Sequence, residues 1–89
     1  MHAVIVSVTI NDGEAAAQYL RGQVVPRVKQ APGFVAGYWV RIEDGNKGGG
    51  TMIFESADAA HAVAAQIHQD QGGATTLGSV DVGEVVESA

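Results

Sequence analysis

The stretch of residues 32–42, PGFVAGYWVRI, constrains the fold of this chain more than any other. A Pro-Gly pair breaks the chain, and the strand that follows is apolar on both faces and holds three of the five aromatic side chains. A strand with one face on a core and the other in water alternates apolar and polar residues. The sequence therefore predicts a strand covered on both sides, by helices of the same chain and by a second copy of the sheet.

The size of the chain limits how much core it can build. Its 89 residues are expected to make one domain over residues 1–89. A domain near this size buries about 60–70% of its unfolded surface, so a small core is often reinforced by metal, disulfides or association. The chain has no cysteine, which excludes disulfides and thiolate metal sites. Association is the expected reinforcement.

The charge balance excludes several partners. The net charge is −5, and the five basic residues are scattered rather than gathered in a stripe. A nucleic-acid binder needs a basic stripe, so neither nucleic acid nor an anionic membrane surface is expected as a partner. The N-terminal residues lack the basic region and cleavage site of a signal peptide, and their apolar run is shorter than the roughly 20 residues of a membrane span. We expect a cytoplasmic protein.

The first third of the chain predicts a strand followed by a helix. Residues 3–10 form a β-branched run typical of a buried strand. Asn11 is expected to cap a helix over residues 12–25, with Glu14 completing a capping box. The buried stripe of this helix repeats every four residues, at Ala16, Leu20 and Val24.

Proline and glycine mark the next boundaries. Pro26 has no backbone N–H, so the helix should kink or restart there and give one more turn over residues 27–30. The polar, glycine-dense segment 43–50 predicts a turn that joins strands over 34–43 and 51–55 as a hairpin.

The last third predicts a second helix and a fourth strand. Ser56 is a good N-cap for a helix over residues 57–69, which Gly72-Gly73 would end. Its apolar stripe is Ala60, Val63, Ala64 and Ile67. Residues 76–86 alternate partly and predict the final strand.

The element order βαββαβ indicates an α+β, ferredoxin-like fold. Two right-handed crossovers place the strands in one four-stranded antiparallel sheet with both helices on one face. The uncovered face would then be too apolar for water. We therefore expect a homodimer through the sheet face.

At this point the chain resembles the dimeric α/β-barrel proteins, in particular those like the antibiotic-biosynthesis monooxygenases. The resemblance covers essentially the whole chain and rests on the strand that enters directly from Met1, on Pro32-Gly33-Phe34, and on the segment 54–60, FESADAA, which is similar to the family's aromatic-Glu-Ser-x-Glu-Ala junction. It implies two sheets packed across a two-fold axis and a pocket between each sheet and its own helices. Members include cofactor-free oxygenases of aromatic polyketides and haem-degrading oxygenases.

Three positions allow the chain to be compared with the catalytic and the haem-degrading members of this family. Catalytic relatives commonly have tryptophan at the junction, where this chain has Phe54. Haem-degrading relatives carry asparagine late in the first strand, where this chain has Ser7, and a helix histidine that would correspond to His61. These departures argue against haem degradation.

Two motifs resemble metal and phosphate sites without fitting them. His61 and His68 lie seven residues apart, or about 10 Å along a helix, which one metal ion cannot bridge. We expect both to be boundary or surface residues and no metal to bind, although one of them touching a ligand is an alternative. The run 48–50, GGG, lacks the Lys-Ser/Thr pair and helix that a phosphate loop needs after its last glycine, so a flexible hairpin is expected.

Tyr38, Trp39 and Arg41 form the most distinctive cluster. Strand alternation puts Trp39 and Arg41 on one face and Tyr38 on the other. An aromatic ring and a guanidinium could bind a planar phenolic or carboxylate ligand, and Tyr19 could add a hydroxyl. The alternative is that Trp39 anchors the core or the dimer interface with Arg41 at its rim.

Two functions follow from these observations. One is a cofactor-independent oxygenase acting on an aromatic or polyketide-like small molecule. The other is a non-catalytic homodimer that binds an apolar small molecule or is structural. Glu55 and Glu84 are base candidates, although solvated carboxylates are the simpler interpretation. The candidate ligand-binding residues are Tyr19, Tyr38, Trp39, Arg41, Phe54 and His61.

Overall fold

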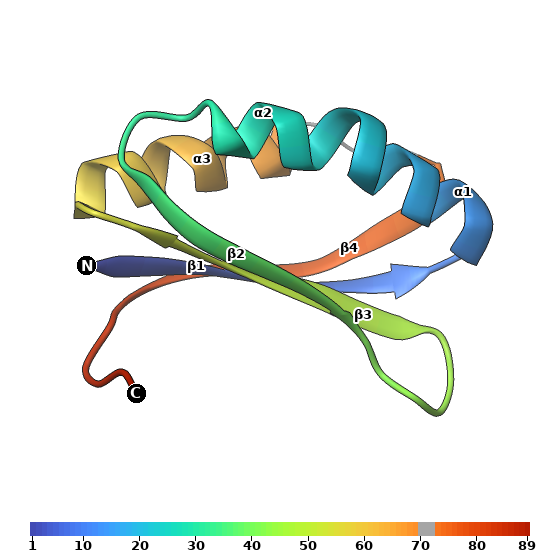
Figure 1. The fold of residues 1–89 in the computed structure, drawn as a ribbon. Helices are drawn as coiled ribbons and strands as arrows, with labels where there is room; N and C mark the ends of the chain where they lie inside the picture. Colours follow the sequence, from blue (N-terminus) through green and yellow to red (C-terminus); the bar gives the residue numbers. More distant parts are fainter. Residues whose placement is uncertain (70–72) are drawn as a thin grey trace.

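The computed structural model describes residues 1–69 and 73–89, in which helices cover one face of a single sheet (Figure 1). In chain order the elements are β1 (His2–Ile10), α1 (Gly13–Tyr19), the π-helical segment η1 (Leu20–Val24), α2 (Val25–Lys29), β2 (Phe34–Arg41), β3 (Lys47–Phe54), α3 (Ala57–Gln69) and β4 (Thr75–Glu84). The strands form one antiparallel sheet in the order β2-β3-β1-β4. All helices cover the same face (Figure 1), so the predicted ferredoxin-like α+β fold is confirmed.

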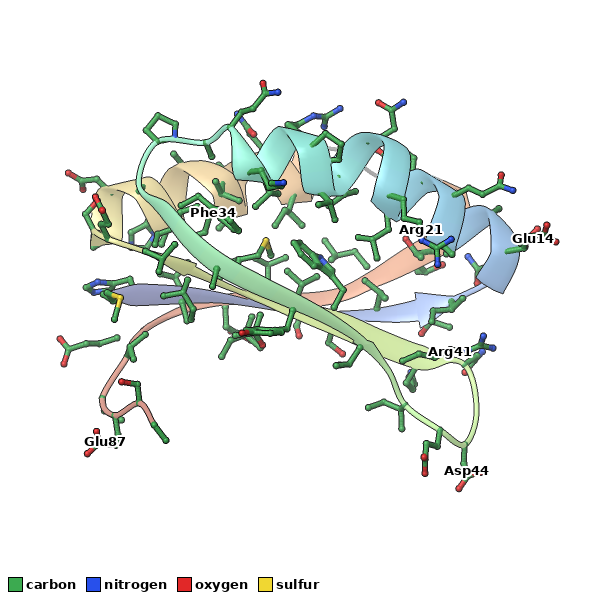
Figure 2. All side chains as sticks on the ribbon, viewed as in Figure 1. Glu14, Arg21, Phe34, Arg41, Asp44 and Glu87 are labelled. Carbon is green, nitrogen blue, oxygen red and sulfur yellow. The ribbon has the colours of Figure 1, made fainter. Side chains whose placement is uncertain are left out.

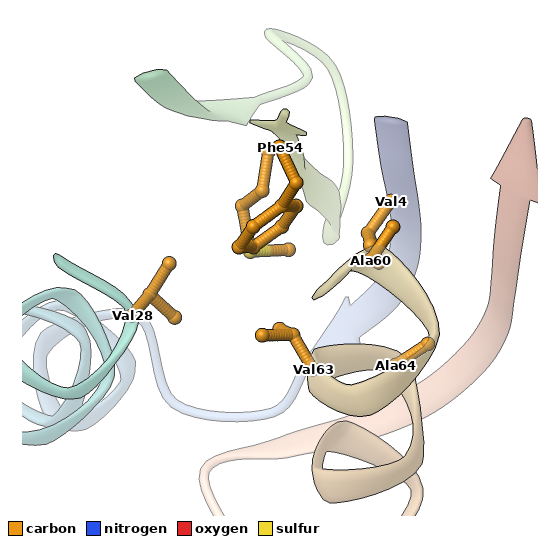
Figure 3. Packing of buried hydrophobic residues seen from close by; sticks show 7 residues of the cluster. Val4, Val28, Phe54, Ala60, Val63 and Ala64 are labelled. Atoms are coloured by element: carbon orange, nitrogen blue, oxygen red, sulfur yellow. The ribbon is translucent and has the colours of Figure 1, made fainter. Parts of the chain in front are cut away.

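The core lies between the sheet and α3. Val4 of β1 and Met52 and Phe54 of β3 point inward and are 0–1% exposed. They meet Val28 of α2 and three small residues of α3 (Figure 3), which are Ala60, Val63 and Ala64. Phe34 packs edge-to-face on Phe54, with ring centroids 5.9 Å apart. Alanine on the inner face of α3 lets this helix approach the sheet closely.

The second helix matches its prediction. Ala59 donates its backbone N–H to Oγ of Ser56 at 3.2 Å, so Ser56 is the expected N-cap. Ala60, Val63 and Ala64 are buried, and the last residue of the predicted stripe, Ile67, packs against the cluster. Gly72, expected to help end this helix, lies outside the described residues.

The first helix begins one residue later than predicted. Asp12, not Asn11, is the N-cap: its backbone is extended, with φ −142° and ψ 105°, and its Oδ1 accepts from the backbone N–H of Ala15 at 3.1 Å. Asn11 instead donates through Nδ2 to Oγ1 of Thr76 at 2.9 Å and so ties the end of β1 to β4. The predicted capping box with Glu14 was wrong because Asn11 is engaged by a strand distant in sequence.

Pro26 restarts the helix through a π turn. In an α-helix, proline removes one backbone donor and its ring clashes with the carbonyl four residues earlier. Here the backbone N–H of Val25 donates to the carbonyl of Leu20, five residues back, which is the wider π spacing. Pro26 then lies at the start of α2. The predicted restart is therefore confirmed, within one continuous helical layer (Figure 1).

The glycine run belongs to a strand and not to the hairpin turn. Gly48, Gly49 and Gly50 pair with Val8, Ser7 and Val6 of β1 and, on their other side, with residues of β2. β2 ends at Arg41, and β3 begins at Lys47. The predicted turn over 43–50 was too long because pairing on both sides outweighs the low strand propensity of glycine.

The other face of the sheet carries no helix and exposes large apolar side chains beside polar ones such as Ser7, Thr51 and Asp81. Its exposed side chains include Ile5 at 49%, Tyr38 at 71% and Val40 at 61%. The C-terminal segment leaves β4 on this side (Figure 1), and the backbone N–H of Val85 donates to the carbonyl of Met1. No helix within residues 1–69 and 73–89 is long and apolar enough to cross a membrane.

Candidate functional site

A cavity of about 470 Å³ lies between the inner face of the sheet and the helical layer, and it opens to solvent. Its floor is formed largely by β1, β2 and β3, and its roof by α1, η1 and α2. The core fills the half of this interlayer space that holds Val4 and Phe54, whereas the cavity lies along the second half of β1, from Val6 to Ile10. Its volume is within the range of small-molecule pockets.

Small residues explain why this half is not filled. The floor includes Gly49 and Gly50, and the roof includes Ala16 and Ala17 of α1. These residues bring little or no side chain into the interlayer space. The stripe predicted to be buried, Ala16, Leu20 and Val24, faces the sheet as expected, but none of its members is buried because the cavity lies beneath them.

Trp39 forms part of the cavity floor. A Cβ added to Gly50, its partner on β3, would lie 2.6 Å from Cδ1 and 2.7 Å from Nε1 of the indole. A Cβ added to Gly37 would lie 2.8 Å from Cη2. The indole therefore spans these two glycines on the inner face of the sheet, where it also packs against the core cluster. Its other face is left for the cavity.

The polar groups around the cavity are biased toward positive charge. Those of its side chains that can hydrogen-bond belong to Tyr19, Arg21, Arg27, Trp39, Arg41, Gln66 and Thr75. Three of the five basic residues of the chain are in this set, yet no aspartate, glutamate or histidine of the described residues lines the cavity. The chain as a whole carries −5, so the cavity has the opposite sign to the molecule.

Arg21 and Arg41 approach the cavity from its two layers. Arg21 belongs to η1 above it and Arg41 ends β2 below it, and Figure 2 shows both toward the α1 end of the molecule. A Cβ added to Gly13 would lie 3.2 Å from Nη1 of Arg41, so the guanidinium passes close to the start of α1. Both arginines are exposed residues at the opening of the cavity rather than buried charges.

The structure brings three of the six candidate ligand-binding residues together. Tyr19, Trp39 and Arg41 all line the cavity. Trp39 and Arg41 share the inner side of β2 and Tyr38 is 71% exposed on the other, as strand alternation predicted. Phe54 is 0% exposed in the core and His61 is exposed on α3, and neither lines the cavity.

Sequence reasoning missed Arg21, Arg27 and Gln66 as lining residues. Arg21 directly follows Leu20 of the helical stripe, and Gln66 directly precedes Ile67 of the other stripe. A polar residue flanking an apolar stripe was therefore the available signal. Glu55 and Glu84, the base candidates, are exposed and lie outside the cavity. No group of three metal-ligating side chains occurs in the part of the chain that is described.

These features define the class of the fold. It is the ferredoxin-like α+β fold, and two solved structures share it over nearly the whole of each chain. HapK from Hahella chejuensis shares it with a TM-score of 0.74 at 14% identity, over 100% of this chain and 96% of that chain. A point mutant of MhuD, crystallised with two manganese protoporphyrin IX bound per active site, gives 0.69 at 18% identity, over 100% and 98%. No family model matches the chain, and no match was found among the curated proteins.

Proposed function

We propose that this protein binds a planar aromatic or polyketide-like small molecule in the cavity between sheet and helices. The observation that carries this proposal is the position of Trp39, whose indole lies over Gly37 and Gly50 with one face toward the cavity. Aromatic rings stack on such a face in an offset geometry. The apolar side chains of Val6, Val8 and Leu20 complete a site that favours a flat, apolar body.

Intrinsic fluorescence tests this proposal directly, because Trp39 is the one tryptophan of the chain. Titration with 2-naphthol is expected to quench Trp39 emission and to saturate. Ala16→Leu places a larger side chain in the cavity and should weaken binding, whereas Ala62→Leu, on an exposed position of α3, should not. N-acetyltryptophanamide corrects for light absorption. Quenching that never saturates, or that Ala16→Leu leaves unchanged, would contradict the proposal.

Cofactor-independent oxygenation is the second candidate function, and the arginines favour it. Nearby cations lower the pKa of a bound phenol or enol, and the resulting anion is the form that donates electrons to O₂. Tyr19 lines the same cavity, and its hydroxyl is the candidate for receiving or relaying a proton. In such a reaction a ring CH₂ and O₂ become a ring C=O and water, so the substrate supplies all four electrons and no cofactor is consumed.

Anthrone is a suitable probe of this activity because it carries such a CH₂ group. The enzyme hypothesis expects protein-dependent O₂ uptake with formation of anthraquinone, above the rate of anthrone in buffer alone, and slower uptake in Arg41→Gln. Saturable binding of 2-naphthol with no acceleration of O₂ uptake would instead support the alternative, a non-catalytic binding protein.

We also propose that the uncovered sheet face pairs with a second copy of the chain. Ile5, Tyr38 and Val40 expose apolar surface there, on strands of one sheet. Protein interfaces commonly combine such exposed apolar side chains with polar ones like Thr51 and Asp81, which lie on the same face. Both functional candidates are compatible with this dimer, because the cavity lies on the opposite side of the sheet.

We expect no specific binding of haem. His61 is exposed on α3, and no histidine lines the cavity among the described residues. Titration with haem is expected to give no defined Soret shift. A shift that disappears in His61→Ala would show this prediction to be wrong.

A further inference from the structure

We infer that the ligand of this cavity is a hydroxyaromatic carboxylate, whose carboxylate group is bound by Arg21 and Arg41 at the opening while its rings lie on Trp39. This inference rests on the proposed function, because it assigns the charge and the orientation of the molecule bound there. It adds a specificity that neither the fold nor the apolar floor provides.

The distribution of charge is the first observation. The cavity is lined by Arg21, Arg27 and Arg41 and by no carboxylate of the described residues, although acidic residues outnumber basic ones by ten to five in the chain. The two remaining basic residues, Lys29 and Lys47, lie outside the lining. An anion entering the cavity therefore meets positive charge, while the rest of the molecule is negative.

The placement of the two guanidinium groups is the second observation. Arg21 comes from the helical layer and Arg41 from the sheet, so they flank the opening from both sides (Figure 2). Among the residues whose side chains the structure describes, 1–67 and 73–89, neither arginine side chain has an ion pair or hydrogen bond. None of these residues therefore competes with an incoming oxygen acceptor for their donors. Gly13 leaves room for the guanidinium of Arg41 beside the start of α1.

The chemistry of these groups selects a carboxylate. Guanidinium is planar and presents paired N–H donors that match the two oxygens of a carboxylate. The flat floor around Trp39 takes the rings of the same molecule, so the anionic group must project toward the opening. Both arginines are exposed, so an ion pair there is only partly desolvated and its contribution is moderate and sensitive to salt.

Calorimetric titration with two matched probes tests the inference. The probes are 3-hydroxy-2-naphthoate and its neutral isostere 3-hydroxy-2-naphthamide, which differ in the charge of one group. We expect the carboxylate to bind roughly three- to tenfold more tightly, as for a few partly exposed charge-assisted contacts. This ratio should fall toward one as the NaCl concentration rises, because salt screens exposed charges.

Variants locate the effect. Arg21→Gln and Arg41→Gln should each reduce the affinity for the carboxylate and leave that for the amide unchanged. Lys29→Gln removes one positive charge from the same helical layer but outside the cavity lining, so it is the matched control and should change neither affinity. Far-ultraviolet circular dichroism checks that each variant is folded. The salt dependence, measured on the unmodified protein, needs no variant.

Each outcome decides between the two proposals. Equal binding of both probes, or an equal loss in Lys29→Gln and Arg41→Gln, would overturn the carboxylate inference and leave the aromatic-binding function intact. Binding of neither probe, together with no response to 2-naphthol, would overturn the proposed function and this inference with it.

Discussion

The indole of Trp39 is held flat against the sheet because two neighbouring positions have no side chain. Gly37 lies two residues earlier on the same face of β2, and Gly50 is the partner of Trp39 on β3. Glycine within a strand weakens it unless a close approach uses the space. Here the indole uses it, and the same contact shapes the floor of the cavity. Of the two places that the sequence allowed for Trp39 as an anchor, the structure supports the core, because the indole packs against the core cluster. The side chain lies on the opposite side of the sheet from the proposed dimer interface.

Gly50→Ala tests this contact. The new Cβ would lie 2.6 Å from Cδ1 of Trp39, so the indole must move. We expect the free energy of unfolding to fall by about 1–3 kcal/mol, as for overpacked core positions, and the emission maximum of Trp39 to shift. Urea denaturation and fluorescence spectra measure both.

Gly83→Ala is the control for this substitution. Gly83 is also in a strand, β4, but a Cβ added there would meet nothing within 4 Å. Its effect on stability should stay within about 0.5 kcal/mol. A Gly50→Ala protein that is as stable as Gly83→Ala and keeps the native emission would show that the indole does not depend on these glycines.

The first helical layer shows how an element adapts to its ends and its neighbours. The π turn at η1 accommodates Pro26 without ending the layer, so Leu20, Arg21 and Val24 all remain along the cavity. π turns are often found at functional sites. In this protein the turn lies directly over the proposed binding site.

Asp12→Ala tests the cap at the start of this layer. The carboxylate of Asp12 satisfies the backbone N–H of Ala15, so its removal should lower the free energy of unfolding by about 1 kcal/mol. Glu14→Gln is the comparison, since Glu14 would be important only if the predicted capping box formed. Thermal or urea denaturation measures both variants. A larger loss of unfolding free energy in Glu14→Gln than in Asp12→Ala would show that the capping box forms after all.

At the scale of the whole molecule the sheet separates two surfaces with different roles. The inner surface holds the core and the cavity, and the outer surface exposes Ile5, Tyr38 and Val40 among polar side chains. A domain of 89 residues can bury only a small core. Covering the outer surface with a second copy would bury apolar surface that one chain cannot cover by itself. Sedimentation velocity at micromolar concentration should therefore give a dimer.

Tyr38→Lys places a charge on the proposed interface and should shift the protein toward monomer. The fold should be kept, because Tyr38 is 71% exposed in one chain. Gln23→Lys introduces the same charge on the exposed side of the helical layer and should leave the dimer intact. An unmodified protein that sediments as a folded monomer would rule out the interface. A fully dimeric Tyr38→Lys protein would show that the dimer forms through another surface.

The sequence by itself determined most of the elements. The β-branched run of β1 and the stripe at Ala60, Val63 and Ala64 are local properties, set by the geometry of strands and helices, and the stripe gives the inner side of α3 correctly. The βαββαβ order then leaves few ways to connect the strands. The fold class could therefore be predicted before any distance was known.

Only the tertiary structure decided the features that depend on residues far apart in sequence. Gly48–Gly50 became strand because β1 and β2 pair with both of its sides, and Asp12 became the cap because Asn11 is bonded to Thr76. Arg21 and Arg41 are twenty residues apart, and they flank one cavity only because the helical layer packs across the sheet. Local sequence patterns carry no information on contacts between residues distant in sequence, since these contacts depend on how whole elements pack.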